Sequence, residues 1–142
     1  MIVYFDTSAL VKLYVDEPRA RPARDAAEAA AVIATSMLTY AEMRSAFARK
    51  RRFGEITPDQ LERFKKEFET DWNTFDIVVI GETIVRRAAD FAENYLLKGF
   101  DAVHLATADS LGPRFGEITF ACFDAELSRA ASACGMTLLR AA

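Results

Sequence analysis

Short apolar runs alternate with longer helical stretches along the whole chain, and this alternation limits the folds that the sequence can adopt. The runs are rich in β-branched and aromatic residues and have the length of strands. They predict strands at residues 2–5, 32–35, 76–80, 118–123 and 136–139, of which 76–80 is the clearest candidate for a buried strand. Strands that alternate with helices favour an α/β fold with a mainly parallel sheet and helices on both faces.

The intervening segments carry helix start and stop signals. Thr57, Pro58 and Gln60 form the pattern of a capping box with proline at the first helical position. Gly54 is a plausible stop for the long helix that precedes it. Helices are expected at residues 9–15, 19–31, 36–53, 58–73, 82–97, 101–111 and 125–133, with Lys98-Gly99 closing the fifth and Gly112-Pro113 the sixth.

Length and composition favour one folded domain over residues 1–142. Apolar residues make up 51% of the chain, which includes 11 Phe, so a full core can form and disorder is excluded. No apolar run approaches the roughly 18 residues of a membrane span, and the N-terminus has no basic region of a signal peptide. Cys122 and Cys134 match no metal or disulfide pattern and are expected to be reduced core thiols of a cytoplasmic protein.

Three aspartates stand where the predicted strands end or the helices begin. Asp6 and Asp124 each follow an apolar strand directly, and Asp101 opens a helix. In open α/β sheets, ligands bind beyond the carboxyl ends of the strands, and Asp6 and Asp124 would point into that region. Each aspartate alone is also explained as a helix N-cap, a role that leaves the second carboxylate oxygen free.

A fourth acid, Glu42, lies in the helix expected at residues 36–53. The spacing of Leu38, Ala41, Ser45 and Ala48 predicts that they form the inward stripe of this helix, with Glu42 on its edge. An acid in such a place needs a partner, and an arginine is the simplest one.

Convergence of the four acids would require a counter-charge. Two carboxylates about 5 Å apart repel by roughly 3 kcal/mol at an effective dielectric constant near 20. A donor set of carboxylates without His or Cys favours Mg²⁺ or Mn²⁺. Such ions orient a phosphodiester and activate a water for attack on phosphorus.

Four segments resemble the motifs of PIN-domain ribonucleases, in particular the VapC-type toxins of bacterial toxin–antitoxin pairs. They are MIVYFDTSALVKL at residues 1–13, YAE at 40–42, GFDAVHLATA at 99–108 and FDAEL at 123–127. The motifs occur in the family's order and span nearly the whole chain. The first and third are fairly specific, whereas the second and fourth are weak alone.

The resemblance implies a three-layer fold with a mainly parallel sheet of about five short strands. It implies an Mg²⁺- or Mn²⁺-dependent endoribonuclease, a cognate antitoxin and a homodimer. We hypothesise that the cations bind a phosphate of single-stranded or loop RNA. Asp6, Glu42, Asp101 and Asp124 would form the catalytic and metal-binding site, with Ser8 and Thr7 hydrogen-bonding around the metal or its water. One departure is Cys122, which stands where such toxins often have Thr or Ser.

Other candidate residues have simpler explanations. His104 is expected to be a packed or hydrogen-bonded helical residue rather than a general base, since a metal-activated water needs no imidazole. Trp72 is expected to serve packing. Two interpretations fit the basic run Arg49, Lys50, Arg51 and Arg52: cations that complement the helix dipole, or a track for RNA phosphates.

Other functions are compatible with strand-end acids. A phosphate-transfer enzyme with Asp6 as nucleophile needs a second aspartate two residues on, where this chain has Ser8. A receiver-like or partner-binding α/β module would bind a cation and leave RNA intact. A flap-endonuclease-like activity on DNA uses similar acids, although this short chain lacks room for the expected DNA-gripping elements. Net charge is −3, which argues against a surface that binds nucleic acid over its whole extent.

Overall fold

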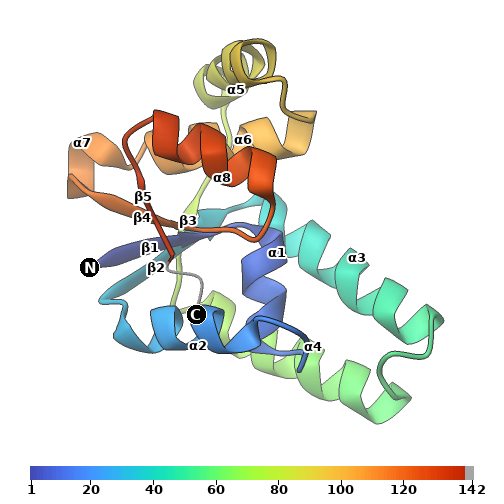
Figure 1. Ribbon diagram of the computed structural model, residues 1–142. Coiled ribbons are helices and arrows are strands. Elements are labelled where there is room, and N and C mark those ends of the chain that lie inside the picture. The colour runs from blue at the N-terminus through green and yellow to red at the C-terminus, as the bar shows by residue number, and fades with distance from the viewer. Residues whose placement is uncertain (140–142) are drawn as a thin grey trace.

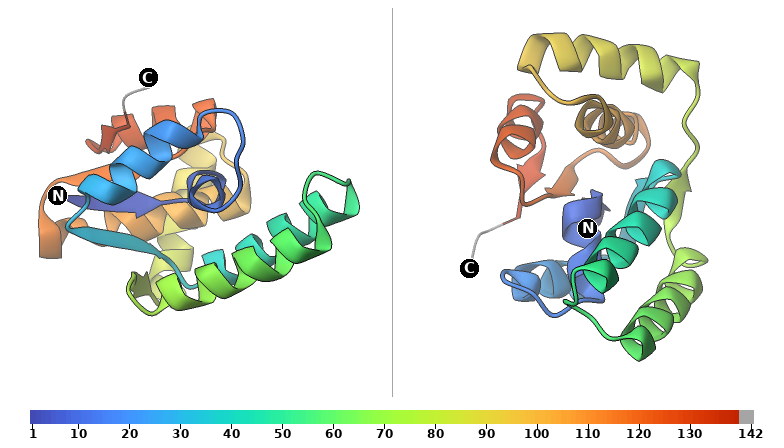
Figure 2. Two further views of the ribbon diagram at one scale, coloured as in Figure 1. Left: turned by 90° about the horizontal axis from the view of Figure 1, so that it is seen from below. Right: turned by 90° about the vertical axis from the view of Figure 1, so that its right-hand side faces the viewer.

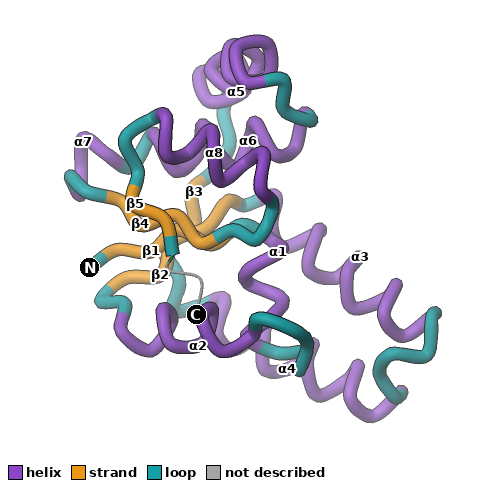
Figure 3. The backbone as a smooth tube through the Cα atoms, viewed as in Figure 1, coloured by secondary structure: helices purple, strands orange, loops and turns teal. Residues whose placement is uncertain are grey.

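The computed structural model describes residues 1–139 and shows a parallel five-stranded sheet between two layers of helices (Figures 1 and 3). The strands are β1 (Ile2–Phe5), β2 (Val32–Ser36), β3 (Asp76–Val78), β4 (Ile118–Ala121) and β5 (Thr137–Leu138). Their order in the sheet is β3-β2-β1-β4-β5, and all four pairings are parallel. The predicted three-layer α/β architecture is therefore confirmed.

Most of the expected helices form close to their predicted places. The described helices are α1 (Thr7–Leu10), the 3₁₀ turn η1 (Val11–Leu13), α2 (Ala20–Ala29), α3 (Leu38–Arg52), α4 (Pro58–Trp72), α5 (Glu82–Tyr95), α6 (Gly99–Asp109), α7 (Gly112–Phe115) and α8 (Ala125–Ala133). The capping box is present, because Thr57 Oγ1 accepts from the Gln60 amide at 3.1 Å and Gln60 Oε1 accepts from the Thr57 amide at 2.8 Å. Gly54 follows α3 with a φ of 74°, as the stop signal predicts.

Two predicted elements differ from the structure at the edge of the sheet and near α6. The predicted strand 76–80 is only three residues long and partly buried, because β3 is an edge strand with β2 as its one neighbour. Gly99 begins α6 rather than closing α5, which ends at Tyr95 with Leu96 in the left-handed region at φ 55°. Helix α7 was not predicted, although Pro113 suits its first turn.

Alternate side chains of β1 enter two separate cores on the two faces of the sheet. Ile2 and Tyr4 pack with residues of α5, α6 and α8. Val3 and Phe5 pack with residues of α1 to α4. This division follows from the period of two along a strand, and the two helical layers are visible on opposite sides of the sheet (Figure 2). Helices α3 and α4 lie side by side and extend outward from the sheet (Figure 1).

The topology brings two of the strand-end acids to the same edge. Strand β1 is central, and its Phe5 is in register with Ala121 of β4. The chain runs from β1 to β2 and β3 on one side and reaches β4 and β5 on the other, so the strand order reverses beside β1. Ligand sites in parallel sheets lie at such a switch point. No helix within residues 1–139 combines the length and apolar character needed to cross a bilayer.

Candidate active site

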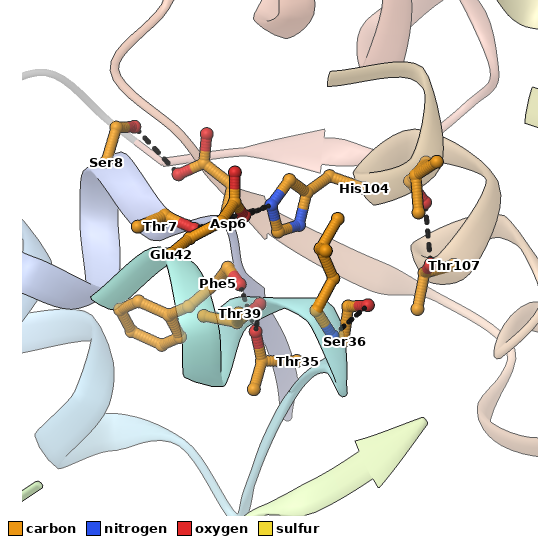
Figure 4. A network of polar contacts seen from close by, with 12 residues as sticks. Phe5, Asp6, Thr7, Ser8, Thr35, Ser36, Thr39, Glu42, His104 and Thr107 are labelled. Atoms are coloured by element: carbon orange, nitrogen blue, oxygen red, sulfur yellow. Dashed lines mark hydrogen bonds and ion pairs between the residues drawn. The ribbon is translucent and has the colours of Figure 1, made fainter. Parts of the chain in front are cut away.

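Asp6 lies at the carboxyl end of β1, where it caps the N-terminus of α1 and is 4% exposed. Its Oδ1 accepts hydrogen bonds from Ser8 Oγ at 2.7 Å and from the Ala9 amide at 3.0 Å (Figure 4). Burial raises the pKa of Asp6, and the nearby His104 and the hydrogen bond from Ser8 oppose that rise only in part. The carboxylate is thus held where its negative charge is poorly solvated.

Ser8 joins Asp6 to the loop that carries Asp124. While its hydroxyl donates to Asp6, its oxygen accepts from the Phe123 amide at 3.2 Å. The two residues of this bond, Ser8 and Phe123, are 115 positions apart in the sequence. One hydroxyl therefore fixes the β1–α1 junction against the β4–α8 junction.

Glu42 lies in α3 and is half-buried between Thr7 and His104. Its Oε1 accepts from Thr7 Oγ1 at 2.6 Å and lies 2.7 Å from His104 Nε2. Burial raises the pKa of Glu42, but the hydrogen bonds from His104 and Thr7 outweigh it, and the pKa lies below its ordinary value. The partners of Glu42 are thus a histidine and a threonine, not the arginine that sequence considerations suggested.

The predicted inward stripe of α3 is wrong. Leu38 is partly buried, and Ala41, Ser45 and Ala48 are exposed. The buried residues of α3 are Thr39, Met43, Ala46 and Phe47. The larger apolar side chains pack inward against the aromatic residues of α4, which leaves the small side chains facing outward. Glu42 still lies at the border of the buried face, beside Met43.

His104 is 2% exposed and bridges Tyr4 to Glu42. Its Nδ1 lies 2.8 Å from the Tyr4 hydroxyl. The Glu42 carboxylate only accepts, so Nε2 carries a proton and donates to it, while the Tyr4 hydroxyl forms the hydrogen bond with Nδ1. The prediction of a hydrogen-bonded helical histidine is confirmed, and its role is to orient Glu42.

Asp101 lies in the first turn of α6 and is half-buried. It is not the N-cap, since Lys98 occupies that position. Burial raises the pKa of Asp101, and the negative charges of Asp124, Asp6 and Glu42 raise it further. Asp101 is therefore close enough to feel the charges of the three other acids, which come from three other segments of the chain.

Asp124 is exposed and caps α8, where its Oδ1 accepts from the Leu127 amide at 2.9 Å. Cys122 supports this turn much as a hydroxyl would. Its Sγ accepts from the Asp124 amide at 3.2 Å and donates to the Asp124 carbonyl at 3.6 Å. Cys122 and Cys134 are both free thiols, as expected.

The chemistry of the four acids suits a hard divalent cation, but they are not assembled around one. Across residues 1–139, no group of three or more Asp, Glu, His or Cys side chains is arranged to hold a metal ion. The mutual repulsion that raises the pKa of Asp101 is nevertheless what a cation would relieve. An all-oxygen donor set of this kind fits Mg²⁺ or Mn²⁺.

A cavity of about 630 Å³ opens beside Glu42 between α1, α3 and the start of α6. Its lining residues are Thr7, Ser8, Val11, Leu38, Ala41, Glu42, Ser45, Ala46, Arg49, Lys50 and Phe100. Arg49 and Lys50 are therefore near the acids, whereas Arg51 and Arg52 lie outside this lining. All four belong to the last turn of α3. There, cations complement the helix dipole.

Three residues near the site carry no recognisable signal in the sequence. Tyr4 looked like an ordinary strand residue, and Phe100 was read only as part of a motif. Lys12 is buried, donates to Glu17 Oε1 at 2.8 Å and lies 5.0 Å from the centre of the Phe123 ring. Trp72 packs against aromatic neighbours, among them Phe68, as expected.

Sequence comparisons place the chain among known proteins. The family model described as PIN domain matches residues 3–133. Two curated proteins from two strains of Mycobacterium tuberculosis, Ribonuclease VapC45 and Ribonuclease VapC49, are each 32% identical to this chain over 134 residues. Each match covers 94% of this chain and 92% of the relative.

Structural comparisons agree with the fold. The crystal structure of FitAcB from Neisseria gonorrhoeae superposes with a TM-score of 0.70 at 17% identity, covering 99% of this chain and 97% of the other. A toxin–antitoxin complex from Klebsiella pneumoniae superposes with a TM-score of 0.55 at 25% identity, covering 82% and 83% of the two chains.

Proposed function

The chain belongs to the PIN domain family, together with the VapC ribonucleases, and from this membership we propose that it is an Mg²⁺- or Mn²⁺-dependent endoribonuclease. The observation that carries the proposal is the linkage of three acidic segments at the carboxyl edge of the sheet: Ser8 joins Asp6 to the loop that carries Asp124, and Thr7 donates to Glu42. An acidic site of this kind attracts divalent cations, and these enable hydrolysis of phosphodiesters. The whole of residues 1–142 would form this single nuclease domain.

In this proposal Asp6, Glu42, Asp101 and Asp124 hold the cation and the substrate. The hydrogen bonds from Ser8 and Ala9 to Asp6 end on Oδ1, and those from Thr7 and His104 to Glu42 end on Oε1, so Glu42 Oε2 remains available. A bound divalent cation supplies Lewis-acid activation of water and charge for the leaving oxygen. Ser8 and Thr7 hold the two carboxylates in place, and Ser8 also fixes the Asp124 loop.

The proposal includes the biological partners of the enzyme. We infer that it acts in the cytoplasm as the toxin of a toxin–antitoxin pair, that a cognate antitoxin neutralises it, and that it forms a homodimer. Support comes from the two relatives named as VapC ribonucleases and from the structural neighbour described as a toxin–antitoxin complex. Expression of the chain alone is then expected to arrest bacterial growth, and the Asp6→Asn variant is expected not to.

Cleavage of RNA by the purified protein tests the proposal. Total RNA is incubated with the wild-type protein, Asp6→Asn and Asp90→Asn, the last an exposed aspartate of α5 outside the site. We expect the wild type and Asp90→Asn to cleave RNA and Asp6→Asn not to. EDTA is expected to abolish cleavage by the wild type, and excess Mg²⁺ or Mn²⁺ to restore it. Unchanged cleavage in EDTA, or by Asp6→Asn, would contradict the proposal. Cation binding without cleavage would favour the alternative, a receiver-like or partner-binding module.

A further inference from the structure

Phe100 is an exposed aromatic residue next to an acid of the candidate site. Its side chain is 62% exposed, although it directly precedes Asp101 and lines the same cavity as Glu42. Other apolar residues of α6, such as Ala102 and Leu105, are buried in the core, whereas the Phe100 ring faces solvent. Phe100 shares the cavity wall with the apolar side chains of Val11 and Leu38, and charged residues lie at its edge. An exposed apolar surface bordered by polar groups indicates a place that meets a ligand.

Helix α3 contributes a different set of side chains to this cavity. Ala41 and Ser45 are small and leave space, and the next turn brings Arg49. The Arg49 guanidinium donates to Ser45 Oγ at 2.8 Å, and this hydrogen bond restrains the direction of the side chain. Burial raises the pKa of Glu42, and the positive charge of Arg49 adds a smaller lowering effect to those of His104 and Thr7. Arg49 is thus a positioned cation close to the acids.

Lys50, the other cation of the cavity, is already balanced by carboxylates. Its Nζ lies 2.6 Å from Glu17 Oε2 and 3.7 Å from Glu55 Oε2. An anionic ligand in this cavity would therefore meet Arg49 as its main cationic contact. The basic run as a whole is then not a uniform track for phosphates.

A flat aromatic face and a guanidinium beside a carboxylate site match the parts of an unpaired nucleotide. A base stacks on an aromatic ring, and a guanidinium binds phosphate through two N–H groups. The volume of about 630 Å³ lies within the range of about 300–1,000 Å³ for small-ligand pockets. Bases inside a duplex are stacked on each other and cannot offer a free face, so the cavity favours single strands and loops.

We propose that Phe100 is a stacking platform for an unpaired base of the RNA substrate and that Arg49 contacts a phosphate of the same strand. This inference rests on the proposed ribonuclease function and adds a specificity-determining residue to it. It also narrows the expected RNA contacts from the four residues of the basic run at 49–52 to Arg49 alone.

Steady-state cleavage of a single-stranded RNA oligonucleotide tests the role of Phe100. Phe100→Ala is expected to lower kcat/KM by roughly 5- to 150-fold, the contribution of one stacked base, mainly through KM. Phe100→Tyr and Phe100→Trp keep a stacking face and are expected to stay close to the wild type. Phe53→Ala, a change at the other exposed phenylalanine of the described chain, is the matched control and is expected to have no effect.

The salt dependence of KM tests the role of Arg49. Arg49→Gln is expected to weaken binding across RNA sequences and to reduce the slope of log KM against log salt concentration by about 1. Arg86→Gln, a change at an exposed arginine of α5, is expected to leave the slope as it is. An Arg49→Gln slope equal to that of the wild type would remove Arg49 from the RNA interface.

The outcomes separate this inference from the proposed function. A wild-type protein that cleaves no RNA under any metal condition refutes the ribonuclease function itself. A wild type that cleaves RNA, with Phe100→Ala indistinguishable from Phe53→Ala, keeps the ribonuclease and overturns the stacking platform. Weakened binding of a protein partner by Phe100→Ala, with RNA cleavage unchanged, also overturns it and assigns the cavity to a protein.

Discussion

His104 Nε2 lies 2.7 Å from Glu42 Oε1 (Figure 4). The other ring nitrogen, Nδ1, lies 2.8 Å from the buried Tyr4 hydroxyl, so the three side chains form one hydrogen-bonded chain. The imidazole is hydrogen-bonded at both nitrogens, because Nε2 donates to the carboxylate and Nδ1 pairs with the Tyr4 hydroxyl, which can serve as donor or acceptor. Thr7 donates to the same Oε1 from α1. Thr7 from α1 and His104 from α6 thus hold one oxygen of Glu42 and leave the other available.

Loss of the His104 donor is expected to impair catalysis through the position of Glu42. His104→Ala should lower kcat by about 10- to 100-fold, the usual cost of removing a group that orients a metal-binding side chain. His104→Gln keeps an N–H near the place of Nε2 and should recover part of the activity. Cleavage kinetics with urea unfolding of both variants will check this. If His104→Ala and His104→Gln had the same activity and the same stability, the N–H donor to Glu42 would not contribute to catalysis.

Local sequence signals were sufficient where an element needs only its own residues. The capping box at Thr57 and the helix at Ala125–Ala133 formed as the sequence predicted. The common edge of Asp6 and Asp124 followed from a general property of parallel sheets. These features depend on neighbours in the sequence or on a rule of topology, so one sequence is enough to predict them.

Features that depend on distant packing were beyond the sequence. The buried face of α3 is set by Phe47 meeting Phe64 and Phe68 of α4, and nothing in the local pattern of α3 states this. The pairing of Tyr4 with His104 joins residues 100 positions apart. The partner of Glu42 could not be predicted for the same reason, because His104 comes from another helix 62 positions away in the sequence.

The Ser8 hydroxyl is expected to matter for both stability and activity. Ser8→Ala removes the donor to Asp6 and the acceptor for the Phe123 amide, which should destabilise the fold by about 1–3 kcal/mol and lower kcat by about tenfold. Ser8→Thr keeps the hydroxyl and is the matched comparison. Urea unfolding and cleavage rates measure the two effects. A Ser8→Ala protein with wild-type kinetics would show that Asp6 holds its position without this bridge.

Cys122 is expected to be replaceable by serine but not by alanine. Its thiol accepts from the Asp124 amide, and a hydroxyl accepts the same bond more strongly. Cys122→Ser should retain activity, whereas Cys122→Ala should lose about 0.5–1.5 kcal/mol of stability and reduce kcat. Burial raises the pKa of the Cys122 thiol well above its ordinary value, so thiol reagents should label Cys134 first in the folded protein. Mass spectrometry of the labelled peptides measures this order.

Glu17 joins Lys12 to Lys50 and connects the loop after η1 to α3. Its Oε1 lies 2.8 Å from Lys12 and its Oε2 lies 2.6 Å from Lys50. Burial raises the pKa of Glu17, but the hydrogen bonds from the two lysines outweigh it and hold the pKa below its ordinary value. A carboxyl whose pKa is lower in the folded state stabilises the fold above its unfolded pKa, and this contribution is lost as the pH falls through the folded pKa.

Glu17→Gln is therefore expected to destabilise the protein by about 1–2 kcal/mol at pH 7, after allowance for partial solvent exposure. The difference from the wild type should shrink as the pH falls below about 4.3, the ordinary pKa of a glutamate, because the wild-type carboxyl then becomes protonated. Urea unfolding of both proteins between pH 7 and pH 3 measures the difference. Glu93→Gln, a change at an exposed glutamate of α5, controls for general charge effects. A Glu17→Gln deficit that stays constant over this range would show that packing, rather than the ion pairs, accounts for the loss.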